Sequence, residues 1–328
     1  MFSILIFLCF LFLRVSLVWV TNYDVNYEFK TECAFKMVLI YGQPSDWKSY
    51  SNRTATITDC MSYCVTLNTC VAVYVEKGSK SCLVFQVGQI QKLKKTESTQ
   101  GHKIAMKVEQ TATCAKSFNS NSMTGSVTTA TSYLAYKIHQ GTDGRWIFTT
   151  TQVLECPDSY RLFTRPKGLW CIGVISVNLC ISGDDSATKC AATGGVLSGL
   201  QTLEETNYIY GLGQAALKKD PTYNKFGYWV NGRRKLSCMP PAQRSASCNG
   251  VDEFTYTDPL LSAYAGYQFA TNEPNGIVAQ STTSNCLNIL FGKTVLFGVD
   301  DNGCTHPNED TELCYKGYVC GMKPSAPA

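Results

Sequence analysis

The sequence has little charge and very little histidine. Asp, Glu, Lys and Arg make up 16% of its 328 residues, the formal net charge is +4, and there are three histidines. Because hydrophobic residues account for 45%, this is a globular chain, neither disordered nor of the nucleic-acid-binding type. We assign its one local basic run to a solvated strand-and-loop face rather than to a site for an acidic glycan. The run consists of Lys92, Lys94, Lys95, His102, Lys103 and Lys107.

The chain also lacks the short motifs of common catalytic sites. It contains neither GxSxG, the motif of serine hydrolases, nor HExxH, the motif of zinc proteases. Its thiols are expected to be paired in disulfides, which leaves no cysteine nucleophile. We therefore predict a binding protein, not an enzyme.

Only one long apolar run is present, and it is the start of the chain, MFSILIFLCFLFLRVSLVWV. We interpret residues 1–20 as a signal peptide. An uncleaved signal anchor is the alternative, but Arg14 is costly inside a membrane. No second run of about 18 apolar residues follows. The sequence thus predicts a secreted, extracellular protein with no membrane attachment after signal cleavage.

Cysteine, in contrast, is abundant. Of the seventeen cysteines, Cys9 lies in the predicted signal peptide and leaves an even number. Such a density is typical of disulfide-rich proteins from an oxidising compartment. Zinc is the alternative, but the histidines are scattered and no paired CxxC occurs. The sequon at Asn52 predicts an N-linked glycan, which agrees with export.

The cysteines form two groups, which predict two domains. Six lie between Cys33 and Cys114 and ten between Cys156 and Cys320, so each group can pair within itself. The stretch between them, residues 115–153, has no cysteine and is rich in Ser and Thr, and we interpret it as a linker. Within it, YLAYKI alternates apolar residues and is compatible with a short strand.

The first domain is predicted as a helix followed by a β-hairpin. Thr58 is the expected N-cap of the helix, which places Cys60 and Cys64 on one helical face. VAVYVEKGSKSCLVFQVG alternates around a Gly-containing turn, as hairpins do. Over residues 33–114 this order resembles the PAN/apple fold, in particular the PAN-like (PAN-3) module of nematode secreted proteins. Spacing alone leaves fifteen connectivities open; the resemblance implies the pairs Cys33–Cys114, Cys60–Cys82 and Cys64–Cys70.

The second domain is predicted to be α+β, with two helices followed by many short strands. The helices are expected around residues 187–190 and over residues 203–217. In chain order, CAATGGVLSGLQTLEE, YWVNGRR, YQFATNEPNG and SNCL…VDDNGC…YVC resemble landmarks of a long-form C-type lectin-like domain over residues 156–323. We expect Trp229 of YWVNGRR to be a core residue. The resemblance implies Cys190–Cys320 and Cys286–Cys304, with Cys156–Cys171 closing an added hairpin and Cys238–Cys248 bracketing an inserted loop. Cys180 and Cys314 remain, and we pair them with each other.

NEPNG, residues 272–276, and VDDNGC, about 25 residues further on, are the candidate binding segments. Each is also compatible with a plain turn. In C-type lectins the sugar site uses a Glu-Pro-Asn segment, in which the proline is usually cis, and an Asn-Asp pair that ends three residues before a cysteine. The resemblance thus assigns calcium and carbohydrate binding to Glu273, Asn275 and Asp301. This Glu-Pro-Asn arrangement implies mannose-type ligands.

The sequence departs from the family pattern at three positions. Val299 replaces a tryptophan, Asp300 replaces the asparagine of the pair, and Ser284 replaces a glutamate ligand. Because it has a hydroxyl in place of a carboxylate, Ser284 is the least suited of the candidate metal ligands. Asp300 restores the carboxylate that is lost at Ser284, and calcium, which prefers six to eight oxygen ligands, is still expected. However, Asp300 does not donate a hydrogen bond to a sugar as asparagine does, which costs on the order of 1.5–3 kcal/mol.

Two functions follow from these residues. The first is a secreted, calcium-dependent lectin that binds mannose-type glycans or glycoproteins in innate immune or surface recognition, with a site made of Glu273, Asn275, Asp300 and Asp301. The second is a protein-binding adhesion module that keeps the fold without binding sugar, because Val299 and Ser284 depart from the pattern. Weak sites gain avidity when joined, and the sequence leaves the oligomeric state open.

Overall fold

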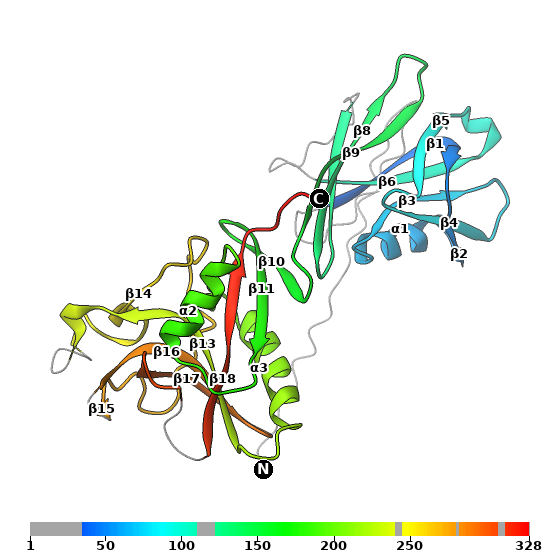
Figure 1. The fold of residues 1–328 in the computed structure, drawn as a ribbon. Helices are drawn as coiled ribbons and strands as arrows, with labels where there is room; N and C mark the ends of the chain where they lie inside the picture. The colour runs from blue at the N-terminus through cyan, green and yellow to red at the C-terminus, as the bar shows by residue number, and fades with distance from the viewer. Residues whose placement is uncertain (1–34, 110–121, 240–244, 280–281, 308–311, 328) are drawn as a thin grey trace, which may run out of the picture. The chain divides into compact units, whose positions relative to one another are not determined.

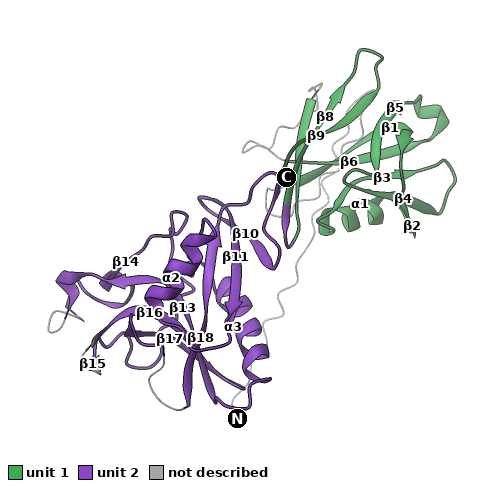
Figure 2. Ribbon diagram, in the orientation of Figure 1, with its two compact units in different colours: residues 1–129, 133–153 green, residues 130–132, 154–328 purple. Residues whose placement is uncertain are grey.

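The computed structural model describes residues 35–109, 122–239, 245–279, 282–307 and 312–327 (Figure 1). These residues divide into two compact units (Figure 2). The first consists of residues up to 129 together with 133–153, and the second of residues 130–132 together with those from 154 onward. The predicted signal peptide and the predicted Cys33–Cys114 disulfide lie outside the described residues. Among those described, no helix combines the length and the apolar character that crossing a bilayer requires.

The first unit is built on a sheet with the strand order β2-β4-β3-β6-β1-β5-β9-β8-β7. Strand β1 belongs to both halves of this sheet, because its first seven residues pair with β6 and the rest pair with β5. The strands are β1 (Phe35–Trp47), β2 (Ser51–Thr54), β3 (Cys70–Val75), β4 (Ser81–Gln86), β5 (Ile90–Lys95), β6 (Lys103–Glu109), β7 (Ser122–Thr128), β8 (Ser132–Gln140) and β9 (Trp146–Glu155). A short 3-10 helix, η1 (Ser98–Gln100), precedes β6.

Helix α1 (Ile57–Thr66) covers one face of this sheet and is attached to it by two disulfides. Its N-cap is Thr56, whose hydroxyl accepts the backbone N–H of Asp59 at 3.2 Å, so the expectation of Thr58 as N-cap was wrong by two residues. Cys60 and Cys64 both point at the sheet, as their four-residue spacing predicts. The predicted hairpin after the helix is the β3–β4 pair.

The prediction of a linker over residues 115–153 was wrong from residue 122 onward. These residues form β7, β8 and the greater part of β9. These strands continue the sheet beyond β5 and pack on the face of β1, β3 and β6 that is opposite α1. Thr and Ser alternate with apolar residues here, and Thr favours strands, so the same composition that suggests a linker also suits a half-buried sheet. Five of their side chains join the core formed by β1, β3, β4, β5 and β6, namely Met123, Val127, Tyr136, Ile138 and Trp146.

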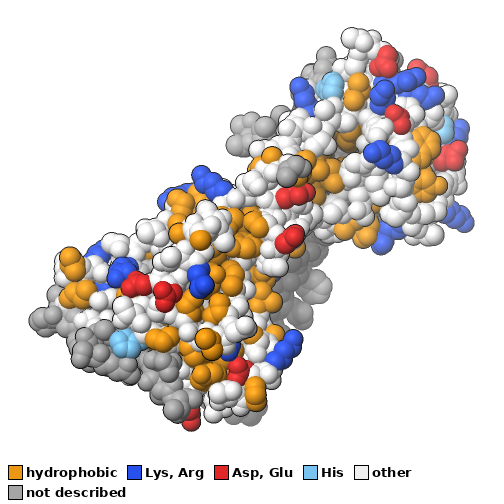
Figure 3. All heavy atoms as spheres, viewed as in Figure 1, with side chains coloured by type: hydrophobic (Ala, Val, Ile, Leu, Met, Phe, Trp, Pro, Cys, Tyr) orange, Lys and Arg blue, Asp and Glu red, His pale blue; other side chains and the backbone are white. Residues whose placement is uncertain are grey.

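Lys107 departs from the expectation that the basic run faces solvent. It is 2% exposed, and its ammonium donates to the carbonyls of Cys64, Val65 and Leu67 at 3.2–3.3 Å. These carbonyls lie at the C-terminal end of α1, where the helix dipole is negative. Lys107 thereby caps the helix from the neighbouring strand. Other Lys and Arg side chains are spread over the first unit (Figure 3).

The second unit has a sheet with the strand order β10-β11-β18-β13-β16-β15. In addition, β12 pairs with β18, β14 with β13, and β17 with β16. The unit also holds helices α2 (Gly183–Ala192) and α3 (Leu203–Leu217) and the 3-10 helices η2 (Leu236–Cys238) and η3 (Gly250–Glu253). The strands are β10 (Tyr160–Arg165), β11 (Gly168–Ser176), β12 (Val196–Leu197), β13 (Lys225–Arg234), β14 (Phe254–Thr255), β15 (Val278–Ala279), β16 (Thr282–Gly292), β17 (Leu296–Gly303) and β18 (Leu313–Met322).

Both helices of this unit begin at side-chain caps. Ser182 accepts the N–H of Asp185 at 3.1 Å, and Thr202 accepts the N–H of Glu205 at 3.2 Å. Helix α3 has the predicted bounds, whereas α2 extends further in both directions than predicted. Trp229 is fully buried on β13 and donates its indole N–H to the carbonyl of Ile181 at 2.7 Å, so it is a core residue as expected.

Seven disulfides are present among the described cysteines, and each joins a pair named in the sequence analysis. They are Cys60–Cys82, Cys64–Cys70, Cys156–Cys171, Cys180–Cys314, Cys190–Cys320, Cys238–Cys248 and Cys286–Cys304. Two of them tie β18, the last strand, to the region of α2 near the start of the domain.

Candidate functional site

The two candidate segments lie together because a short ladder joins the loop before β15 to strand β17. The N–H of Val299 donates to the carbonyl of Gln268 at 2.7 Å, and the N–H of Ala270 donates back to Val299 at 2.9 Å. This pairing sets NEPNG beside VDDNG. The peptide bond between Glu273 and Pro274 is cis.

Three carboxylates meet at this place. One oxygen from each of Glu273, Asp300 and Asp301 lies within 4.8 Å of the other two. Asn275 holds Glu273 in position, since its side-chain amide donates to Oε1 at 2.8 Å and its backbone N–H to Oε2 at 3.0 Å. The side-chain oxygen of Asn275 accepts the N–H of Ile277 at 2.8 Å. The structure thus brings four of the predicted site residues together.

The electrostatics of the cluster are unfavourable without a cation. Partial burial, followed by the charges of Asp300 and Asp301, raises the pKa of Glu273 to about 8. Glu273 therefore holds a proton at neutral pH unless a positive charge enters the cluster. A hard divalent cation is the group that such oxygens suit.

Asp301 is the most constrained of these carboxylates. It is 2% exposed, and its oxygens accept the backbone N–H groups of Asn275 at 2.7 Å and Gly276 at 3.0 Å. It also accepts from the buried guanidinium of Arg234 at 2.7 Å. A carboxylate offers about four acceptor positions, so Asp301 retains limited capacity for a metal. Asp300 and Glu273 are better placed to bind one.

Asp300 has a hydrogen-bond donor beside it that was not predicted. The side-chain amide of Asn302, which is 3% exposed, donates to Oδ2 of Asp300 at 3.1 Å. The other side-chain oxygen of Asp300, Oδ1, accepts the backbone N–H of Asp301 at 2.8 Å. The cluster therefore still contains a side-chain amide, but this amide belongs to Asn302 and donates to Asp300 instead of occupying position 300.

Ser284 lies beside this cluster and contributes backbone contacts. Its N–H donates to the carbonyl of Ile277 at 3.0 Å, and its own carbonyl accepts from Nε of Arg234 at 3.0 Å. The first bond connects β16 to the candidate loop, and the second connects β16 to the end of β13. Ser284 therefore supports the loop, and its role as a metal ligand remains a prediction.

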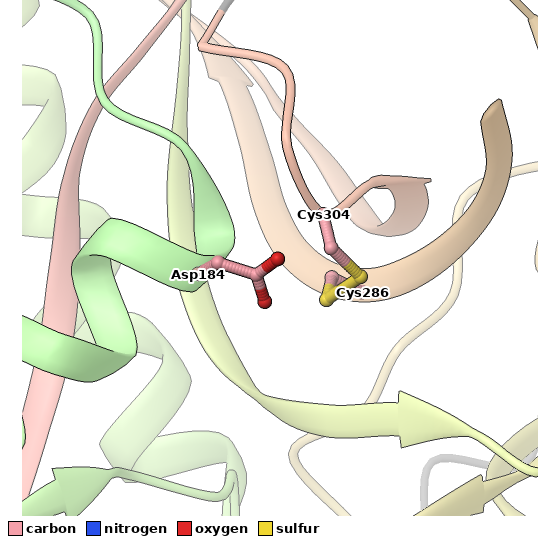
Figure 4. A group of neighbouring side chains, drawn as sticks. All are labelled: Asp184, Cys286 and Cys304. Carbon is pink, nitrogen blue, oxygen red and sulfur yellow. A yellow bond between two sulfur atoms is a disulfide. The ribbon is translucent and has the colours of Figure 1, made fainter. Parts of the chain in front are cut away.

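A second group of side chains has the spacing of a metal site but not the chemistry. Asp184 extends from the start of α2 toward Cys286 and Cys304 (Figure 4). The two sulfur atoms form a disulfide, so neither is a thiolate that could bind a metal. Asp184 is instead paired with Arg233 at 2.7 Å. Beside this pair, α2, β12 and β13 enclose a largely apolar pocket of about 340 Å³.

Comparison with known proteins assigns both units. A PAN-like domain model matches residues 37–108. The family described as C-type lectin domain-containing protein 141/158 matches residues 157–323, which is half of the chain. The chain belongs to this C-type lectin domain family. Its first unit therefore carries a PAN-like domain, to which the structure adds strands β7–β9 beyond the matched residues.

One relative and two solved structures are similar to part of this chain. C-type lectin domain-containing protein 158 of Caenorhabditis elegans is 24% identical in an alignment of 194 positions, which covers 52% of this chain and 90% of the relative. The C-type lectin domain of murine dendritic cell inhibitory receptor 2, solved with an N-glycan, is 18% identical and covers 52% of this chain and 99% of its own, with a TM-score of 0.32. A calcium-independent type II antifreeze protein is also 18% identical, covers 53% and 98%, and has a TM-score of 0.32.

Sequence reasoning missed three residues at the site, Arg234, Glu253 and Asn302. Arg234 had a weak signal, because it follows Arg233 in a strand, where neighbouring side chains point to opposite faces and one of the two must face inward. Glu253 lies after the inserted loop, far from both candidate segments, and nothing in the sequence connects it to them. Asn302 stands directly after Asp301, and its proximity to Asp300 depends on the path of β17.

Proposed function

We propose that the second domain of this C-type lectin family member is a calcium-dependent carbohydrate-binding module of the mannose type. The observation that carries the proposal is the cluster of Glu273, Asp300 and Asp301, with Asn275 bonded to Glu273. Three carboxylates at this separation repel one another, and a divalent cation removes that repulsion.

The roles of the residues follow from their contacts. Glu273, Asn275 and Asp300 hold calcium through their side-chain oxygens, and Asp301 contributes through its remaining acceptor capacity. When bound, calcium supplies a positive centre for two neighbouring sugar hydroxyls. Glu273 accepts a hydrogen bond from one hydroxyl, while the amide of Asn275 donates to the other. Asp300 accepts a hydrogen bond from the sugar but donates none. The sugar therefore receives one hydrogen bond fewer than it would from an asparagine at position 300.

A glycan array probed with and without a chelator tests this function. We expect binding to mannose- or fucose-bearing glycans in calcium and none in EDTA. The variant Glu273→Gln should lose the binding, whereas Glu204→Gln, a matched change at an exposed carboxylate on α3, should keep it. Asp301→Ala is a poor test, because it also removes one of the two buried carboxylate partners of Arg234. Absence of any calcium-dependent glycan signal from the wild type would refute the proposal.

The second candidate function is a protein-binding adhesion module that does not use sugar. It is favoured by the contacts of Asp301, whose oxygens already serve two loop amides and Arg234. In that case calcium leaves the melting temperature unchanged, since a ligand that binds the native state raises it by mass action. A clear rise with calcium would exclude this alternative.

We further propose that the protein is secreted as a glycoprotein and acts in surface or innate immune recognition, by binding rather than by catalysis. The density of disulfides fits an extracellular protein. Asn52 is exposed on β2, an edge strand, so its side chain is accessible for the attachment of a glycan. Expression in insect cells tests both points: the protein should reach the medium, and peptide N-glycosidase should shift the wild type on a gel but not Asn52→Gln.

A further inference from the structure

Arg234 has surroundings that link three parts of the second unit. It is the last residue of β13, its side chain is fully buried, and it forms ion pairs with Glu253 and with Asp301. Its Nε donates to the carbonyl of Ser284 on β16 at 3.0 Å. The guanidinium also lies 4.8 Å from the ring centre of Phe254. An arginine stays charged at any accessible pH and offers its donors in a rigid plane, so these partners are held in a fixed arrangement.

The link continues from Arg234 into the candidate binding loop. Asp301, which Arg234 holds, accepts the backbone N–H groups of Asn275 and Gly276. These amides flank the side chain of Asn275, which in turn fixes Glu273. A continuous series of short polar contacts therefore runs from the end of β13 to the segment Glu273–Gly276.

We propose that Arg234 is a positioning residue that holds the segment Glu273–Gly276 in its binding conformation whether or not calcium is present. The inference deepens the proposed function, because it concerns the order of the same loop. In a site whose carboxylates are held only by a metal, removal of the metal releases the loop. Here a guanidinium that is part of the chain supplies a permanent positive charge to Asp301, so calcium binds to a loop that is already in place.

Glu253 completes the arrangement and connects it to the inserted loop. Arg234 has two carboxylate partners: Glu253 pairs with its Nη1 and Asp301 with its Nη2. Glu253 ends η3, which follows the disulfide Cys238–Cys248, and its carbonyl accepts the N–H of Lys235 at 2.8 Å. The insertion thus returns the chain to the end of β13, where Glu253 meets Arg234.

Hydrogen exchange measured by mass spectrometry on the whole protein tests the inference. The readout is the peptide that spans residues 269–277, in EDTA and in calcium. For the wild type we expect slow exchange of the Asn275 and Gly276 amides in both conditions. In Arg234→Lys, which retains one charge but loses the planar fork, we expect these amides to exchange about 10- to 100-fold faster in EDTA, the factor that corresponds to losing one charge-assisted contact.

Arg165→Lys is the matched control. Arg165 is also fully buried and also binds two carboxylates, those of Glu205 and Asp258, but it lies on β10 and contacts α3 and the Asp258 loop. Its loss should destabilise the unit to a similar degree while the 269–277 peptide stays protected in EDTA. If Arg234→Lys does not fold, Asp301→Asn keeps the shape of the carboxylate and cuts the same link, and it should also accelerate exchange.

The outcomes separate this inference from the proposed function. Fast exchange of the wild-type loop in EDTA and slow exchange in calcium would overturn the positioning role while supporting calcium binding. Slow exchange in both conditions, lost in Arg234→Lys but not in Arg165→Lys, supports the positioning role even if no glycan binds. Equal acceleration of this peptide in the two arginine variants would reduce the effect to general destabilisation and refute the inference.

Discussion

Replacing Glu273 by glutamine should stabilise the calcium-free protein at high pH and leave it unchanged at low pH. The pKa of Glu273 is about 8 in the folded protein, against an ordinary value of 4.5. Between these values the folded state binds more protons than the unfolded state. The stability of the calcium-free wild type must therefore fall as the pH rises through this window. Glutamine does not titrate in this range, so the stability of Glu273→Gln should not show this decrease.

The magnitude follows from the separation of the carboxylates. Two unit charges 4.8 Å apart repel by about 0.9 kcal/mol in bulk water and by about 3.5 kcal/mol at an effective dielectric constant of about 20. Glu273 is only half-buried, so we take the lower end, about 1 kcal/mol for each of its two neighbours. About 2 kcal/mol corresponds to a difference in melting temperature of about 4–8 °C for a unit of this size.

The assay is thermal unfolding in EDTA at pH 4.0 and pH 8.5, with Glu204→Gln as the control. Wild type and Glu273→Gln should melt together at pH 4.0, below both pKa values of Glu273, and the variant should melt higher at pH 8.5. Calcium should raise the melting temperature of the wild type at pH 8.5 and leave that of Glu273→Gln unchanged. Equal melting temperatures of the two proteins at pH 8.5 in EDTA would refute the electrostatic reasoning.

Three further predictions concern stability. Lys107→Met should destabilise the first unit by about 1–3 kcal/mol, because three helix-end carbonyls lose their donor, and chemical denaturation should detect it. Trp146→Ala should cost the same unit about 3–5 kcal/mol through a cavity in its core, and a change below about 1 kcal/mol would mean that β9 is not part of that core. Replacing both Cys180 and Cys314 by serine should lower the stability of the second unit by about 2–4 kcal/mol, measured by urea unfolding without reductant.

The resemblance predicted the lectin-like domain well because its cues are local and regular. Helix α3 has a cap at Thr202 and a long apolar periodicity, and its predicted bounds are the observed ones. The disulfide pairs required family knowledge, since the spacing alone left the connectivities open. Each pair that lies within the described residues is present.

What the sequence left open depends on distant partners. Arg234 is separated by 67 residues from Asp301, and the two meet only because β13, β16 and β17 are neighbours in one sheet. The prediction that residues 122–153 form a linker was wrong for a related reason. A strand rich in Thr is polar on one side, and only the presence of an uncovered sheet face shows where its apolar side goes.

The strands that replace the predicted linker bear on how this protein can be divided. The PAN-like match ends at residue 108, yet the face of the sheet opposite α1 is covered by residues 122–153. A fragment cut at the family boundary would expose Val38, Ile104 and Met106 to water and would be prone to aggregate. The natural place to separate the two units for expression is therefore near residue 153, which is 45 residues beyond the end of the family match at residue 108.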